Sequence, residues 1–198
     1  MPQLEEVESY IRGLWMLFRG NAEGFRWLDI SARGFWRSFW AIAYCVPPII
    51  LSWIAFRSSY LGLLPVGAPV ADLFYFKLLV IELAGWFVPC AALIALSQLT
   101  GNGAMAVPLV IATNWLSVPL QWLYAVDNAI QLLFPDGEGL AAILFLALLS
   151  LSLIAHYRIM SRIMPNDKLM PAAFVMVLFV VSYYSQYQLM KVTGLWLS

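Results

Sequence analysis

Five long apolar stretches constrain this chain more than any other feature of its sequence. They cover, approximately, residues 39–56, 73–97, 104–126, 139–157 and 170–190. Each approaches the roughly 20 residues that an α-helix needs to cross about 30 Å of hydrocarbon. Because lipid offers no partners to backbone N–H and C=O groups, such stretches fold as helices. The sequence therefore predicts an all-α protein, a polytopic membrane helix bundle of about five transmembrane helices within residues 36–198.

The composition agrees with a membrane environment and argues against several classes of partner. Of 198 residues, 63% are hydrophobic and 11% are charged, whereas a soluble domain carries roughly 25% charged residues. Eleven Lys and Arg residues balance eleven Asp and Glu residues, so no basic surface favours nucleic acid. The two cysteines lie in apolar runs and the histidine is single, which predicts neither a metal site nor a cofactor. We expect membrane lipids as the immediate partners.

The first 35 residues are predicted to form a cytoplasmic or interfacial region. Between residues 3 and 19, apolar side chains recur at helical spacing and charged side chains occupy the other faces, which predicts an amphipathic helix. This helix either lies on the membrane surface or packs under the bundle. Residues 25–40 mix Arg with Trp and Phe just before the first span, as an interfacial aromatic belt does. Ser31 or Asp29 is expected to cap the incoming helix.

The basic residues predict an orientation in the membrane. The N-terminal region and the connection between the fourth and fifth spans are basic, whereas the connection between the third and fourth is acidic. The positive-inside rule then places the N-terminus in the cytoplasm and the C-terminus in the periplasm of a bacterial inner membrane. The basic residues are Arg12, Arg19, Arg26, Arg33, Arg37, Arg158, Arg162 and Lys168, and the acidic ones are Asp127, Asp136 and Glu138.

Polar side chains inside the predicted spans mark the candidate site. Glu82 is expected near the middle of the membrane, where an ionised group costs on the order of 2.5–3.5 kcal/mol. Asn114, Ser117 and Gln121 form a polar stripe along one face of the third span. Asn114 is expected at the depth of Glu82, as its hydrogen-bond partner. Gln186 belongs to a polar run in the fifth span that is expected to line, with this stripe, a small cavity open to the outside.

Two interpretations of these polar residues remain open. They either join helices through interhelical hydrogen bonds or form a path for a proton or small polar solute. The sequence contains no hydrolase, nucleotide-binding or metalloprotease motif, and we expect no enzymatic activity. An intramembrane enzyme subunit that works with a partner is the remaining, third hypothesis.

Two short motifs resemble a known family. Gly34-Phe-Trp-Arg-Ser-Phe-Trp40, preceded by Leu28-Asp-Ile30, resembles the entry to the first span in a group of small bacterial membrane proteins, and Asn114-Trp115 adds to the likeness. That group is similar to the Yip family of five-span proteins. The resemblance implies five spans, a cytoplasmic N-terminus and a C-terminus outside or in the lumen. The Asp-Leu-Tyr-Gly-Pro motif of eukaryotic Yip proteins is absent.

Together these features favour a non-enzymatic, Yip-like membrane protein. It is expected to act as a binding or accessory component of a membrane assembly, with a protein partner or as a homo-oligomer. The alternative is a small channel or transporter that uses an intramembrane polar path around Glu82 and Asn114.

Overall fold

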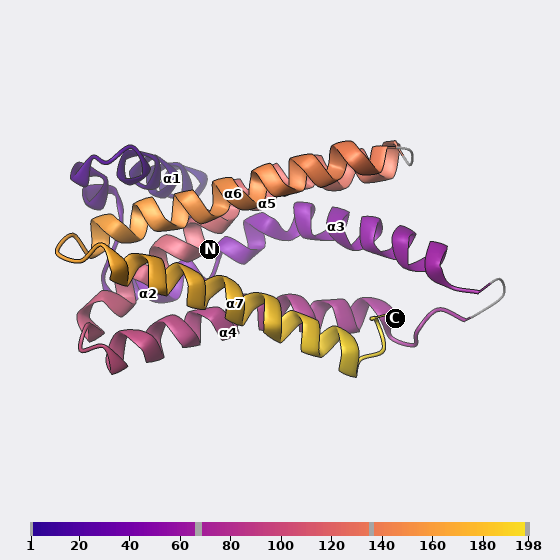
Figure 1. The fold of residues 1–198 in the computed structure, drawn as a ribbon. Coiled ribbons are helices and arrows are strands. Elements are labelled where there is room, and N and C mark those ends of the chain that lie inside the picture. The colour runs from indigo at the N-terminus through magenta and orange to yellow at the C-terminus, as the bar shows by residue number, and fades with distance from the viewer. Residues whose placement is uncertain (1, 66–68, 135–136, 197–198) are drawn as a thin grey trace.

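The computed structural model describes residues 2–65, 69–134 and 137–196, and all regular elements in these residues are helical (Figure 1). The long helices run side by side in a bundle, and a short N-terminal helix lies across one end of it. The elements are α1 (Leu4–Phe18), η1 (Ala22–Trp27), α2 (Ala32–Ser38), α3 (Ala41–Leu63), α4 (Phe74–Leu99), η2 (Gly103–Met105), α5 (Ala106–Leu133), α6 (Glu138–Ile163) and α7 (Leu169–Val192).

The five predicted spans are confirmed as helices long and apolar enough to cross a membrane, which is the architecture of a multi-pass membrane protein. They extend beyond the predicted limits, because polar residues that reach the interface remain compatible with helix. The first span is predicted to end near residue 56, whereas α3 continues through Arg57 to Leu63. Asp127 lies within α5, and Arg158 and Arg162 lie within α6, rather than in the connections.

The N-terminal helix packs under the bundle, which is one of the two placements considered from the sequence. The helix α1 contacts α5 and α6 and buries Val7, Leu14 and Leu17. The ring of Tyr10 stacks on that of Trp115, with 4.6 Å between centroids and 9° between planes. These contacts remove two large aromatic rings from solvent at the end of the bundle.

Short polar links attach this end of the chain to the first span. Ser31 caps α2 by accepting a hydrogen bond from the Gly34 N–H at 3.2 Å, which confirms one of the two predicted caps. Arg37 forms an ion pair with Glu6 of α1. The Tyr44 hydroxyl donates to the Pro2 carbonyl oxygen at 2.6 Å. The start of α1 is thus tied to α2 through Arg37 and to α3 through Tyr44.

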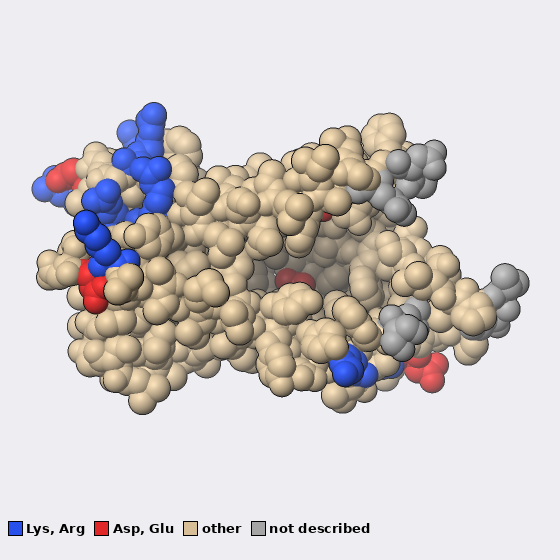
Figure 2. All heavy atoms as spheres, viewed as in Figure 1, with Lys and Arg blue, Asp and Glu red and all other residues tan. Residues whose placement is uncertain are grey.

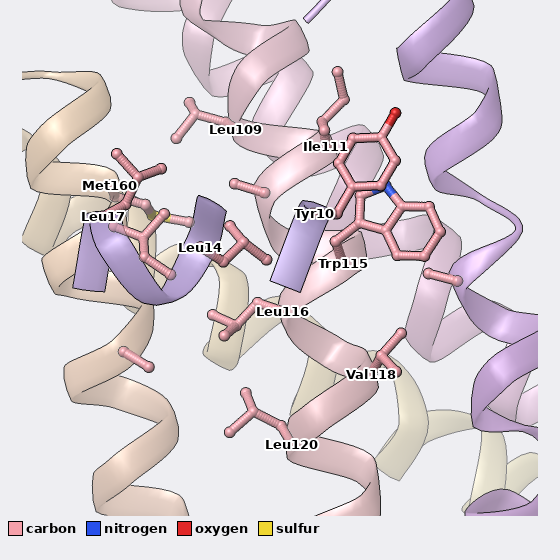
Figure 3. Packing of buried hydrophobic residues seen from close by; sticks show 14 of the residues in the cluster. Tyr10, Leu14, Leu17, Leu109, Ile111, Trp115, Leu116, Val118, Leu120 and Met160 are labelled. Atoms are coloured by element: carbon pink, nitrogen blue, oxygen red, sulfur yellow. The ribbon is translucent and has the colours of Figure 1, made fainter. Parts of the chain in front are cut away.

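The best-packed part of the bundle surrounds the first half of α5. Figure 3 shows that Tyr10, Leu14 and Leu17 of α1 meet side chains of α5 there. In α5, Leu109, Val110, Ile111 and Trp115 are fully buried. We call this half, which holds α1, α2 and the turn between α6 and α7, the basic half, because most of the Lys and Arg residues visible in Figure 2 lie at its end.

The opposite half of the bundle, which we call the open half, is packed less densely. Figure 1 shows α6 and α7 diverging from their shared turn. The buried residues of α7 are Pro171, Phe174, Val175 and Leu178, all within its first ten positions. Further along α7, Tyr183 is 72% exposed. The two helices therefore touch near their turn and separate from each other beyond it.

Candidate functional site

A cavity of about 220 Å³ occupies the space that this divergence leaves. Figure 2 shows the hollow in the face between α6 and α7, with acidic atoms visible inside it. Residues of α4, α5, α6 and α7 line the cavity. The five candidate residues named from the sequence belong to this lining, namely Glu82, Asn114, Ser117, Gln121 and Gln186. Of the other residues in the polar run 182–188 of the fifth span, only Ser182 is in the described lining.

The helix α3 closes the bundle on the side away from this hollow. It packs along α5, and its aromatic side chains also reach α4. Phe56 and Tyr60 contact the ring of Phe74, at 6.1 and 5.2 Å between centroids, and Trp53 lies 6.5 Å from Tyr75. The slot between α4 and α5 is therefore covered, whereas the slot between α6 and α7 remains open.

The predicted hydrogen bond between Glu82 and Asn114 is wrong. The Asn114 side chain instead donates to the Ser38 hydroxyl at 2.9 Å and accepts from the Cys90 thiol at 3.4 Å. The helices α4 and α5 are antiparallel and joined by a short turn, so Asn114 faces Cys90. Glu82 comes before Cys90 in α4, about two helical turns or 12 Å away. Asn114 thus sits at the floor of the cavity, and Glu82 lies higher in its wall.

Glu82 and Gln186 are brought together by a close approach of α4 and α7. The amide of Gln186 lies over Gly85, where a side-chain carbon would collide with it. Gln186 also donates to the Ser182 hydroxyl one turn earlier, at 3.3 Å. The side chain of Trp53 on α3 lies close to the Glu82 carboxyl group. Among the described residues of α5, α6 and α7, no side chain donates a hydrogen bond to Glu82.

His156 also lines the cavity, although it is not among the residues predicted from the sequence. Its Nδ1 lies 2.8 Å from the Ser152 carbonyl oxygen. Because a carbonyl only accepts, we assign the proton to Nδ1, which makes Nε2 of the neutral ring an acceptor. The ring also packs edge-on against Phe179, with 5.4 Å between centroids. The only sequence signal is the i, i+4 spacing of Ser152 and His156 in an otherwise apolar helix.

The cavity is acidic and rich in hydrogen-bond acceptors. Glu82 is its acidic residue, and no Lys or Arg belongs to the described lining. The Tyr124 and Ser152 hydroxyls lie 3.3 Å apart on the wall formed by α5 and α6. One turn beyond Tyr124, the side chain of Asp127 is buried. One of its carboxyl oxygens accepts from Gln131 at 2.9 Å, and the other has no hydrogen-bond partner among the described residues. The site therefore favours a ligand that donates hydrogen bonds or carries positive charge.

Comparisons with protein-family models, with curated proteins and with solved structures found no match to this chain. The residues of the cavity are therefore interpreted from their own chemistry.

Proposed function

We propose that this protein binds a small polar or cationic group in the Glu82 cavity, as a small transporter or channel does. The observation that carries the proposal is convergence: polar side chains from four helices line one cavity of about 220 Å³. One water needs only about 10–15 Å³ of such space. The cavity is thus large enough for a solute of several heavy atoms.

The hydrogen-bond pattern favours binding over the joining of helices. Residues that join helices bond to one another across an interface, as Asn114 does with Ser38 and Cys90. Gln121 forms no side-chain hydrogen bond with the described part of the chain, and Gln186 bonds only within its own helix. The amide atoms of Gln121 and Gln186 are also not fully buried without a hydrogen-bond partner. These amides therefore face the cavity, where a ligand or water can bond to them.

The charge distribution supports the predicted orientation, with the basic half in the cytoplasm. Arg12, Arg19 and Arg26 lie in or beside α1, and Arg162 lies in α6 next to the turn that leads into α7. The cavity then opens in the outer half of the membrane. A Yip-like accessory role in a membrane assembly remains the competing hypothesis, and it predicts a stable protein partner.

Thiol accessibility tests the proposal. Gln186→Cys and Gln121→Cys are made in a Cys45→Ala, Cys90→Ala background, and membrane-impermeant methanethiosulfonate reagents are added to intact cells. We expect both introduced thiols to react, and the trimethylammonium reagent to react faster than the sulfonate reagent. Adding Glu82→Gln should reduce that preference, since the attracting carboxylate is gone. Mass spectrometry of the purified protein measures the extent of reaction.

Val175→Cys is the matched control. Val175 lies on nearly the same face of α7, 11 positions or about three turns before Gln186, but is only 4% exposed. It should stay unmodified. Reaction of the Gln186→Cys thiol only after permeabilisation would reverse the orientation. No reaction under either condition would overturn the proposed binding cavity.

A further inference from the structure

We propose that the cavity takes the headgroup of an amine-bearing membrane lipid, which enters sideways between α6 and α7. This inference rests on the proposed function and names the ligand of the same site. Three features of the open half carry it: the direction in which the cavity opens, the chemistry of its lining, and its size.

The cavity opens toward the hydrocarbon rather than only toward the aqueous phase. Its lining comes from α4 to α7, and the hollow lies in the face between α6 and α7 (Figure 2). This face is suited to contact with lipid, because the parts of both helices that flank the hollow expose large apolar side chains. Those that are at least half exposed include Leu140, Ile143, Leu146, Val180, Tyr183 and Tyr184. A ligand arriving from this side moves in the plane of the bilayer.

The lining selects a primary ammonium group over the other common headgroups. Glu82 supplies a carboxyl group, whose ionised form a bound cation favours, and the oxygens of Gln121 and Gln186 and the Nε2 of His156 are acceptors. A primary ammonium offers three N–H donors and a positive charge, which matches this set. A trimethylammonium group carries the charge but has no N–H to donate. A glycerol headgroup carries no positive charge, and its phosphate would meet Glu82 without a counterion.

The size of the site restricts the lipid to placing only its head inside. A cavity of about 220 Å³ accommodates an ethanolammonium group, whereas two acyl chains are several times larger. The chains must therefore remain outside the bundle, along the apolar flanks of α6 and α7. A lateral opening is the geometry that allows the head and the chains to occupy different environments at once.

Competitive lipid retention tests this inference. The full-length protein is reconstituted into nanodiscs containing equal amounts of phosphatidylethanolamine, phosphatidylcholine and phosphatidylglycerol with identical chains. It is then extracted in mild detergent, and bound lipid is identified by native mass spectrometry. We expect phosphatidylethanolamine to be retained roughly tenfold over each of the others, the ratio that corresponds to about 1.4 kcal/mol. The Glu82→Gln variant should bring that ratio close to one.

Asp72→Asn is the matched control, because Asp72 is an exposed acid just before α4, outside the lining, and its loss should leave the ratio unchanged. If Glu82→Gln does not fold, the Gln186→Cys thiol is modified with the trimethylammonium reagent after folding, which should abolish the selectivity.

Equal retention of the three lipids by the unmodified protein would overturn the inference. So would a preference that survives both Glu82→Gln and the modified thiol. Since the thiol reaction itself reports water access, a reacting thiol without lipid selectivity would leave the proposed function intact and reject only the amine lipid.

Discussion

Neighbouring residues of α5 serve different parts of the molecule because a helix turns them apart by about 100°. Trp115 points into the packed basic half and stacks on Tyr10. Asn114 points toward α2 and α4, where it bonds Ser38 and Cys90 and forms the floor of the cavity. The indole N–H of Trp115 is buried and has no hydrogen-bond partner within the part of the chain that the structure describes, so this side chain contributes through packing.

Tyr10→Ala should lower the free energy of unfolding by about 3–5 kcal/mol, the range for removing a buried aromatic ring. Tyr10→Phe should cost about 1 kcal/mol or less, because the ring is kept and the hydroxyl makes only a 3.5 Å contact with Glu6. Denaturant unfolding in detergent micelles, followed by tryptophan fluorescence, measures both changes. Equal losses in the two variants would mean that the hydroxyl, not the stacking, holds α1 in place.

At the scale of elements, hydrogen bonds at the N-terminus of α7 fix the end at which α7 stays close to α6. The turn between them is short, and Asp167 lies just before α7. One Asp167 carboxylate oxygen accepts from the Leu169 and Met170 N–H groups, at 2.7 and 3.0 Å. These hydrogen bonds keep the pKa of Asp167 below its usual value of 3.8. The start of α7 is thus anchored in the basic half, and its later turns are free to diverge.

Asp167→Ala should lower the melting temperature at pH 7 by no more than about 4 °C, as expected for the loss of one helix cap. Because the pKa of Asp167 is lower in the folded protein, its carboxylate stabilises fully above the usual pKa. That stabilisation is lost as the pH falls below 3.8 and through the lowered pKa.

The difference between wild type and Asp167→Ala should therefore be constant from pH 7 to about 5 and shrink below about 4. Asp167→Asn keeps a side-chain oxygen at the cap and should lie closer to wild type at pH 7. Thermal unfolding in detergent across this pH range checks the prediction, and a difference that grows on acidification would contradict it.

At the scale of the whole molecule, the bundle divides into a closed basic half and an open half. The same helices contribute to both, but α1 fills the end of the basic half with side chains from residues 7–17. No described element plays that part at the opposite end, where α6 and α7 separate and leave the cavity. The bundle is thus closed at one end by aromatic and aliphatic side chains and hollow toward the other.

Hydrogen exchange should report this division along a single helix. The backbone amides of residues 182–186 border the cavity, whereas those of residues 174–177 lie in the packed part of α7. We expect the first group to exchange at least about tenfold faster, since local opening costs less where few contacts are buried. Exchange in nanodiscs, read by mass spectrometry of peptides, measures the ratio. Equal protection would mean that α7 is held uniformly and that the open half is closed in the bilayer.

The number and type of the spans and the identity of most polar lining residues could be predicted from the sequence, because both depend on local patterns. Hydrophobic length determines a span, and helical spacing places Asn114, Ser117 and Gln121 on one face. The boundaries were less predictable, since residues such as Asp127 continue a helix once it reaches the interface.

Only the tertiary structure decided what these residues contact. Asn114 bonds Ser38, which is 76 positions away, and a two-turn offset between α4 and α5 separates it from Glu82. Such a register depends on the length of the turn and on packing between distant segments, neither of which leaves a local pattern. The same reason explains His156, a lone histidine in an apolar helix. Its role as a lining residue is visible only in the structure, where α6 and α7 diverge and leave His156 in the wall of a cavity.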